Sequence, residues 1–357
     1  MPEGSNQTFT EDAAGADVKF VSAEKAIAVI FRRTLSVSTV TVAGILVAGL
    51  FPILLPLVFL TDFFRRVNFA GVRVLFFLEG FLIMEVLGVL VSAVIWLAEL
   101  PGRDDARFER RNYALQNWWG TSIARMGIWL FNLRMVVEEP FEYRSKPFIL
   151  FIRHASFIDT FLSIYHISSQ HKTRLRYVLK KELLADPCLD IVGNRIPNVF
   201  VDRKSEDSVA QIQAVRRLGA RLDPDEGVLI YPEGTRFTRA KRNRIVERAL
   251  KTGSDELAFA SQFESVLPPR LGGPLALLES IPDVDVVFCA HVGFESTVDP
   301  KQLLSGKLIN AEIRVRFERI SGEDIPASYD ERKTWFVEHW LEMDRTITHW
   351  NDGALNE

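Results

Sequence analysis

The sequence predicts an α/β protein in which a mixed, largely parallel sheet is flanked by helices and preceded by a membrane-embedded helical hairpin. Two observations predict this fold class. Apolar runs long enough to cross a bilayer occupy residues 39–60 and 74–100. From about residue 145, short runs rich in β-branched and aromatic residues alternate with helical patterns, which is the arrangement of a sheet buried on both faces.

The composition fits one large domain with an appendage. The chain has 357 residues, of which 48% are hydrophobic and 25% charged, and its formal net charge is −3. This charge gives no overall basic field, so no nucleic-acid partner is expected. Cys188 and Cys289 lie far apart without CxxC spacing. They are therefore expected to be small core residues of a protein in a reducing compartment, not a disulfide or a zinc site.

Residues 1–35 are expected to form a polar, partly disordered segment, and residues 36–100 a membrane hairpin. The two prolines of the first apolar run are tolerated in membrane helices. The second run carries Glu79 and Glu85. Because charges inside a bilayer are costly, these two must be protonated, paired or turned toward the first helix. A buried helix on a membrane-facing domain is the alternative, and both a spanning and a re-entrant hairpin fit the sequence.

Residues 101–144 are expected to form an interfacial, basic and aromatic helical segment. Its arginines and tryptophans are Arg103, Arg107, Arg110, Arg111, Trp118, Trp119 and Trp129. Such side chains suit the boundary between lipid and water, while a solvated helix with core tryptophans is the alternative. We expect a protein that is integral to a membrane or deeply inserted, with its α/β domain facing the cytoplasm.

Residues 145–357 are expected to form the α/β domain and to end in an amphipathic helix. The strand candidates are "PFILFI", "RYVLKK", "VFVDR", "GVLIYPEG", "DVVFCAHV" and "EIRVRFERI". A helix is expected to begin at Ser205, followed by two acidic residues that suit a first turn. The sequence has no internal repeat and no glycine-rich nucleotide loop.

A histidine and an aspartate five positions apart occur twice in the chain. His339 and Asp344 lie in the predicted last helix, where five residues advance about 500° and leave the side chains roughly 140° apart. They are expected to be solvated or to lie at an interface. His154 instead follows a strand, and Asp159 falls in the first turn of a helix. Asp159 could then fix the tautomer of the imidazole, and His154 could accept a proton.

The stretch "LIYPEGTRFT" predicts an anion site at a strand-to-helix turn, with a helix that starts beside Thr235 and Arg236. Backbone N–H groups at such a turn, together with a guanidinium, bind anions. An ordinary turn is the alternative for Glu233 and Gly234, because the same pair of residue types also occurs at 226–227.

Two further basic features follow strands or turns. Asp202 and Arg203 end the predicted strand "NVFVDR", where an arginine can hold a phosphate with two hydrogen bonds; a surface salt bridge is the alternative. The basic run at residues 239–251 is typical of a solvated helix face. It could also attract anionic lipid or a nucleotide-bearing acyl carrier.

These motifs, taken in order, resemble the glycerolipid acyltransferases of the lysophosphatidic acid acyltransferase type. Four blocks over about residues 145–295 carry the resemblance: His154, Ser156 and Asp159; Phe200, Asp202 and Arg203; Glu233, Gly234, Thr235 and Arg236; and Val266, Leu267, Pro268, Pro269 and Arg270, taken as an apolar strand ending at proline. The strings "EGTRFT" and "VLPPRLGG" look most like the lysocardiolipin and lysophospholipid acyltransferase branch. Arg153 and Pro197 depart from the asparagine and glycine that are usual in the family.

The resemblance implies a mechanism. His154 would deprotonate the free hydroxyl of a lysophospholipid, such as lysophosphatidic acid, while Asp159 holds the imidazole. The hydroxyl would attack the thioester of acyl-CoA, or of an acylated carrier protein, without an acyl-enzyme. Arg203 and Arg236 would hold the acceptor phosphate, with residues 233–235 shaping the turn. Residues 266–270 would line the acyl-donor side, with Ser156, Phe200 and Asp202 in support. No metal and no cofactor is expected, and acyl-CoA is a co-substrate.

Other functions remain open at this point. Within enzymes, the acceptor could be glycerol 3-phosphate, or the transfer could be a CoA-independent exchange between phospholipids. Of another class, the chain could be a catalytically inactive, membrane-anchored lipid-binding protein, although the intact His154–Asp159 and 233–236 sets speak against it. A soluble phosphoryl-transfer enzyme lacks a phosphate loop here and leaves the apolar residues 39–100 unexplained.

Overall fold

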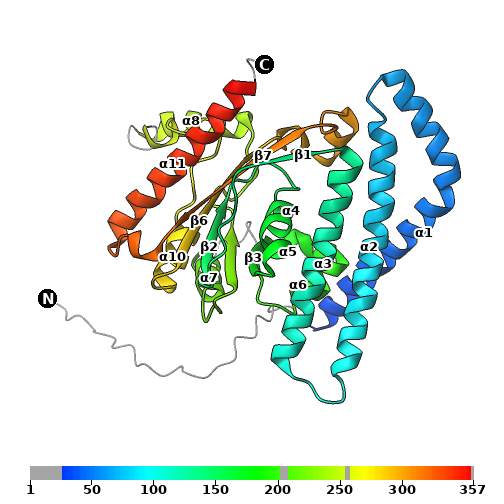
Figure 1. Cartoon of the computed structure of the whole chain (residues 1–357), viewed down its shortest axis with the longest axis horizontal. Coiled ribbons are helices and arrows are strands. Elements are labelled where there is room, and N and C mark those ends of the chain that lie inside the picture. The colour runs from blue at the N-terminus through cyan, green and yellow to red at the C-terminus, as the bar shows by residue number, and fades with distance from the viewer. Residues whose placement is uncertain (1–25, 202–207, 254–257, 355–357) are drawn as a thin grey trace.

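Three long helices lead into one seven-stranded sheet in the computed structural model, which describes residues 26–201, 208–253 and 258–354 (Figure 1). The helices are α1 (Ala26–Arg65), α2 (Ala70–Glu99) and α3 (Asp105–Phe131). Helix α1 begins before residue 36, within the segment expected to be polar and partly disordered. Both α1 and α2 are long and apolar enough to cross a membrane, judged by length and composition alone.

Acidic side chains near the middle and the end of helix α2 form hydrogen bonds and ion pairs with other parts of the protein. Glu85 is fully buried and accepts hydrogen bonds from Trp119 Nε1 and from the backbone N–H of Cys188, both at 3.1 Å. Glu99 forms ion pairs with Arg107 and Arg111 on α3. Of the arrangements expected for Glu85, the structure therefore shows pairing with the domain, not a turn toward α1.

The first helix and the end of α3 are also attached to the domain. Arg32 on α1 forms a 3.0 Å ion pair with the buried Asp190 of α6 (Pro187–Gly193). At the end of α3, Asn132 adopts a left-handed conformation (φ 51°) and donates a 2.7 Å hydrogen bond to Asn310. The chain then enters the first strand at Arg134, so α3 and the sheet are joined without a linker.

The sheet has the order β1-β7-β6-β2-β5-β3-β4 and is parallel except between β6 and β7. Its strands are β1 (Arg134–Glu139), β2 (Phe148–Ile152), β3 (Arg174–Lys180), β4 (Val199–Val201), β5 (Glu226–Ile230), β6 (Asp285–Val292) and β7 (Glu312–Ile320). The predicted fold class is confirmed. Strand β1 lies before residue 145, so the sheet takes in part of the segment expected to be interfacial.

Alternating side chains of the strands fill two apolar cores. Ile149 and Phe151 of β2 face α7 (Ser208–Leu218), α10 (Gly272–Ser280) and α11 (Tyr329–Ala354). Phe148, Leu150 and Ile152 face the other core, toward α4 (Thr160–Ser163), a π-helical turn (Ile164–Ser168) and α5 (Ser169–His171). Helix α3 lies outside this second layer, and α2 and α1 lie farther out (Figure 1). Both cysteines are buried and free, as expected.

Two expected elements differ from the structure. Residues 266–270 form no strand, and Val266 and Leu267 are buried in an irregular segment against α11. Helix α8 (Arg239–Thr252) begins after Thr238, whose hydroxyl accepts a hydrogen bond from Lys241 N, and not beside Thr235. Thr238 caps the helix because its side-chain oxygen satisfies a first-turn N–H group that has no partner within the helix.

Candidate active site

A histidine and a carboxylate meet at the edge of the sheet where the parallel strands β2 and β5 end. His154 follows β2 directly, and Asp159 precedes α4. Asp159 Oδ2 lies 3.1 Å from His154 Nδ1 and accepts hydrogen bonds from the N–H groups of Ala155 (2.6 Å) and Ser156 (2.7 Å). The carboxylate therefore orders the short loop and holds one ring nitrogen of His154, which is the arrangement of a base and the group that orients it.

Burial has the largest effect on the pKa of Asp159. The loss of water raises the pKa of this carboxyl from 3.8 to about 6, while His291, the Ser156 N–H and Arg153 act to lower it. His291 Nε2 lies 3.8 Å from Asp159 Oδ1, an oxygen without a hydrogen-bond partner in the described part of the chain. Burial also lowers the pKa of His291, which favours a neutral imidazole behind the pair.

Arg153 is an interior cation beside this pair. Its side chain is 1% exposed, and it donates hydrogen bonds to the carbonyl oxygens of His291 (2.7 Å) and Ser265 (3.0 Å). It also forms an ion pair with Glu295. The departure from the family pattern at this position therefore lies within the protein interior, where the guanidinium joins the ends of β2 and β6 to the loop before residue 266.

Glu233 connects His154 to the segment 266–270 through hydrogen bonds. Its side chain is buried, and its two oxygens accept hydrogen bonds from His154 N (2.6 Å) and Leu267 N (2.9 Å). Burial raises the pKa of this carboxyl to about 8, although both N–H groups and Arg153 lower it. Because both oxygens are engaged by the backbone, Glu233 positions the histidine and the 266–270 segment.

The turn after Glu233 gathers basic side chains. Gly234 has φ 69°, and a Cβ added there would lie 2.9 Å from Arg270 Cδ, so Arg270 packs directly on the turn. Arg236 donates a hydrogen bond to the carbonyl oxygen of Val298. Lys241 Nζ donates to Thr235 Oγ1 at 2.9 Å. Arg270, expected on the acyl-donor side, therefore lies against Gly234 of the turn that was expected to bind phosphate.

The remaining candidate residues either pack or hydrogen-bond within the domain or lie outside the described residues. Ser156 Oγ is hydrogen-bonded at 2.7 Å to Thr297. Phe200, half-buried in β4, lies against Gly193. Pro269 is buried and Pro268 half-buried. Asp202 and Arg203 lie outside the described residues.

A narrow apolar cavity of about 60 Å³ adjoins the loop between His154 and Asp159. Its lining includes Phe77, Ile128, Phe131, Phe157, Ile158 and Phe294. Sequence reasoning missed this cavity because its walls come from segments that are far apart in the chain. It also missed His291, whose signal was a histidine at the end of a buried strand, and Lys241, which was grouped with a solvated basic run.

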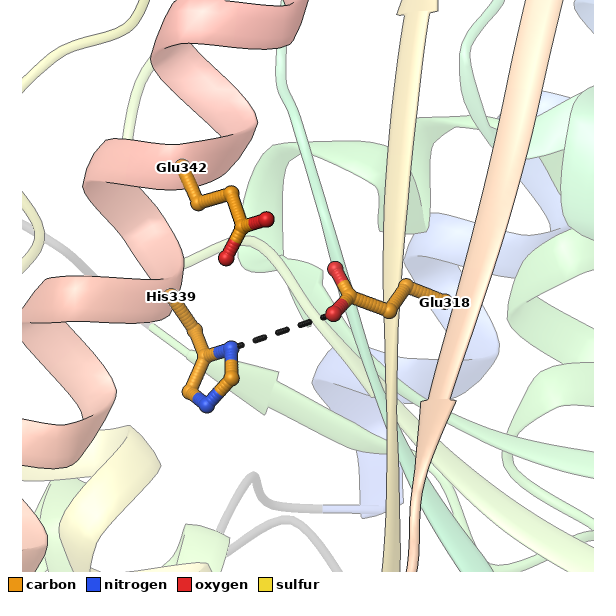
Figure 2. A group of neighbouring side chains, drawn as sticks. All are labelled: Glu318, His339 and Glu342. Atoms are coloured by element: carbon orange, nitrogen blue, oxygen red, sulfur yellow. Dashed lines mark ion pairs between the residues drawn. The ribbon is translucent and has the colours of Figure 1, made fainter.

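The second His-x4-Asp pair is a structural feature. His339 stacks on Phe288 (ring centroids 5.5 Å apart) and lies 4.0 Å from a Glu318 oxygen, with Glu342 beside it (Figure 2). Asp344 is 3% exposed and accepts N–H groups of the segment 264–266 at 2.7–3.2 Å. The expectation that Asp344 is solvated or at an interface is wrong, because this carboxylate caps a buried loop.

Comparisons with known proteins match the part of the chain that carries the site. The family model described as Acyltransferase matches residues 134–272. Lysocardiolipin acyltransferase 1 of Gallus gallus is 25% identical over 161 residues, covering 44% of this chain and 41% of that protein. The 1-acyl-sn-glycerol-3-phosphate acyltransferase gamma of Homo sapiens is 31% identical over 185 residues, covering 50% of this chain and 46% of that protein.

One solved structure was also compared: the 1-acyl-sn-glycerophosphate (LPA) acyltransferase PlsC of Thermotoga maritima has a TM-score of 0.46 and 13% identity, covering 76% of this chain and 95% of that chain. The chain spans less than half the length of the curated relatives named above. The match to the Acyltransferase family model thus includes the His154–Asp159 pair and the 233–236 turn.

Proposed function

We propose that the protein transfers a fatty acyl group from acyl-CoA to the free hydroxyl of a lysophospholipid, lysophosphatidic acid or a close relative. The observation that carries the proposal is the His154 Nδ1–Asp159 Oδ2 contact of 3.1 Å at the C-terminal edge of the parallel strands. The similarity to proteins named lysocardiolipin acyltransferase 1 and 1-acyl-sn-glycerol-3-phosphate acyltransferase gamma also supports it.

The pair supports general-base catalysis. With Nδ1 held by Asp159, Nε2 is the nitrogen that accepts the proton of the attacking hydroxyl. The carboxylate stabilises the imidazolium that forms, and the hydroxyl oxygen attacks the thioester carbonyl. The same proton then leaves with the thiolate of CoA. In this scheme no acyl group is bound to the enzyme.

The basic turn supports a phosphate-bearing acceptor. Arg270 lies against Gly234 of this turn, and Lys241 at the start of α8 donates a hydrogen bond to Thr235 of the same turn. Guanidinium and ammonium groups both bind phosphate, and arginine can do so with two parallel hydrogen bonds. Arg203, which follows β4 in the sequence and lies outside the described residues, is proposed as a further phosphate ligand.

The apolar cavity beside Phe157 and Ile158 supports placement of the acyl chain next to the reacting hydroxyl. The apolar surface of α1 and α2 supports delivery of both lipids from a bilayer. In this proposal the α1–α2 hairpin lies in one leaflet, because Glu85 and Glu99 hold α2 against α3 and α6. The domain would then face the cytoplasm.

The test is an acyltransfer assay with the full chain in detergent. It would follow a radiolabelled acyl group from acyl-CoA to a panel that contains lysophosphatidic acid, other lysophospholipids and glycerol 3-phosphate. His154→Ala should lower kcat by about 10²–10⁴-fold, as expected for loss of a general base. His339→Ala, which removes a histidine of the same spacing outside the site, should leave kcat unchanged.

The same assay distinguishes between the possible acyl donors and between the possible acyl acceptors. Transfer from acyl-CoA to a lysophospholipid supports the proposal, and labelling only from a diacyl phospholipid would make the protein a transacylase. Full activity of the His154→Ala variant would show that His154 is not the general base. Acylation of glycerol 3-phosphate alone would replace the acceptor.

A further inference from the structure

A second cavity, which is polar and has a volume of about 570 Å³, lies between α3 and the turn that joins α5 to β3. Its lining includes Arg174, the first residue of β3, and Asp225, the residue before β5. His154 instead follows the C-terminal end of β2. Because β2, β3 and β5 are parallel, this cavity and His154 lie at opposite edges of the sheet. The cavity is therefore separate from the candidate active site.

One face of α3 forms a wall of the cavity. The residues that line it are Arg110, Tyr113, Ala114, Asn117, Trp118, Thr121, Ser122 and Arg125. Steps of three and four residues place these side chains on the same side of a helix. Trp118 on this face is 44% exposed. The face is thus basic at both ends and aromatic in the middle.

Basic side chains outnumber acidic side chains in the lining of this cavity. Arg110, Arg125 and Lys172 line it, and these three side chains have no ion-pair partner within the described ranges. Arg174 is already paired with Asp223 and Asp225, the latter being the acidic residue of the lining. Three cations are therefore available to a ligand of negative charge.

Two buried hydroxyl groups of the same wall lack hydrogen-bond partners. Tyr113 is 1% exposed and Thr121 is 8% exposed, and neither Tyr113 Oη nor Thr121 Oγ1 has a partner in the described structure. A buried polar group without a partner costs free energy. Both oxygens are fully covered by the protein, so the cations Arg110, Arg125 and Lys172 are the groups that a ligand in the cavity can reach.

We propose that this cavity binds the phosphate headgroups of anionic glycerophospholipids in the leaflet that holds the α1–α2 hairpin. Arg110 and Arg125 are 15 positions apart, which separates their Cα atoms by about 22 Å along the helix. One inorganic phosphate cannot reach both, whereas neighbouring headgroups at a membrane surface can. The opposite side of α3 packs on α2, so the helix lies between the apolar hairpin and the domain. Exposed Trp118 and Trp129 suit the lipid–water boundary.

The test measures lipid binding without an acyl donor, so its result does not depend on the proposed reaction. The full chain in neutral detergent is titrated with phosphatidylglycerol or with phosphatidylcholine, and bound lipid is counted by native mass spectrometry. The groove variant combines Arg110→Gln, Arg125→Gln and Lys172→Gln. Since each basic residue near an anionic surface contributes about fivefold, its affinity for phosphatidylglycerol should fall on the order of 100-fold. Binding of phosphatidylcholine should not change.

A matched control removes the same charge elsewhere. Lys251→Gln, Lys333→Gln and Arg345→Gln alter exposed cations of α8 and α11. This variant should bind phosphatidylglycerol as the wild type does. Equal losses in the control and groove variants would overturn the proposal, as would unchanged binding by the groove variant. If the triple groove variant does not fold, Arg110→Gln and Arg125→Gln are tested singly, each with an expected loss of about fivefold.

Two further arms separate the sources of phosphate and the role of the hydroxyl. Inorganic phosphate, added at concentrations equal to those of the lipid, should not displace phosphatidylglycerol; displacement would show a free-anion site and overturn the lipid assignment. Tyr113→Phe removes an unpaired buried hydroxyl, so the lipid-free protein should be as stable as the wild type or more stable. Because the Tyr113 oxygen does not reach the cavity, the same variant should bind phosphatidylglycerol as the wild type does. A loss equal to that of the groove variant would contradict the assignment of binding to the three cations.

Discussion

Arg153 supplies a buried positive charge next to two carboxyl groups whose protonation the site depends on. The guanidinium lowers the pKa of Asp159 and of Glu233, against the larger effect of burial, which raises both. Besides Arg153, Asp159 interacts with His154 from its own loop, with His291 and Cys289 from β6, and with the Tyr231 hydroxyl and Glu233 after β5. At the scale of single residues, Arg153 is therefore expected to set the pH at which Asp159 can hold a charged imidazole.

The pH dependence of acyltransfer should reflect this. Because the pKa of Asp159 is about 6, kcat/KM should fall as the pH drops below about 6, where the carboxyl is protonated. Arg153→Met removes a charge that lowers this pKa, so the acidic limb should move upward, by on the order of one pH unit. Arg153→Lys keeps the charge and should leave the limb near its original place. A limb that moves downward in Arg153→Met would contradict this account.

Gly234 offers a second test at this scale. Its φ of 69° is unfavourable for residues with a side chain, and an added Cβ would lie 2.9 Å from Arg270 Cδ. Gly234→Ala should therefore destabilise the protein by about 1–2 kcal/mol and raise the KM for the acceptor by displacing Arg270. Chemical denaturation and initial rates measure the two effects. Gly102→Ala, at a site with open space around it, is the control, and an equal change there would contradict the expectation.

At the scale of elements, α11 holds the segment that carries Leu267 in place. Asp344 accepts the N–H groups of Glu264, Ser265 and Val266, and Trp340 Nε1 donates to Leu267 O at 3.1 Å. Glu233 then joins Leu267 to His154. Helix α11 is thus linked to His154 through one irregular loop.

Asp344→Asn tests this link. The amide group would replace one carboxylate oxygen with a donor facing backbone N–H groups, so buried donors would lose their partner. The free energy of unfolding should fall by about 1–3 kcal/mol. Urea denaturation followed by circular dichroism measures it, with the exposed Asp330→Asn as the control. Indistinguishable unfolding midpoints for the two variants would contradict the role given to Asp344.

Most elements could be predicted from the sequence because their apolar residues follow strand or helix periods. Strand β1 could not, because its side chains are half-buried or exposed at the edge of the sheet and give no apolar run. His154 and Asp159 were predictable because they lie close together in the chain and their pairing depends on local geometry. The roles of His291, Arg270 and Asp344 depend on contacts between distant segments, which no local pattern records. The second His-x4-Asp pair shows how little the spacing itself conveys.

At the scale of the whole molecule, the hairpin and the domain form a continuous stack of layers, from α1 through α2 and α3 to the sheet (Figure 1). Glu85, Glu99 and Asp190 carry the ion pairs and hydrogen bonds between these layers. These polar contacts hold the middle and the end of α2 against the domain, which supports the proposed placement of the hairpin in one leaflet.

Both ends of α2 are therefore expected on the same side of the membrane. Arg65→Cys and Gly102→Cys place thiols near the two ends, while the native Cys188 and Cys289 are buried and should not react. In sealed vesicles with the domain outside, a membrane-impermeant maleimide should label both engineered thiols. Labelling of one thiol, with the other reached only after detergent is added, would show that α2 spans the bilayer.

The junction at Asn132, where α3 passes into β1 without a linker, has a consequence for how substrates arrive. The protein cannot tilt its domain toward the solvent without breaking this junction and the contacts of Glu85. With the hairpin in one leaflet, as proposed, the edge of the sheet that carries His154 would stay at a constant height and angle above that leaflet. Encounter with a lipid acceptor becomes a search in two dimensions, in which lateral diffusion along the leaflet replaces extraction into water.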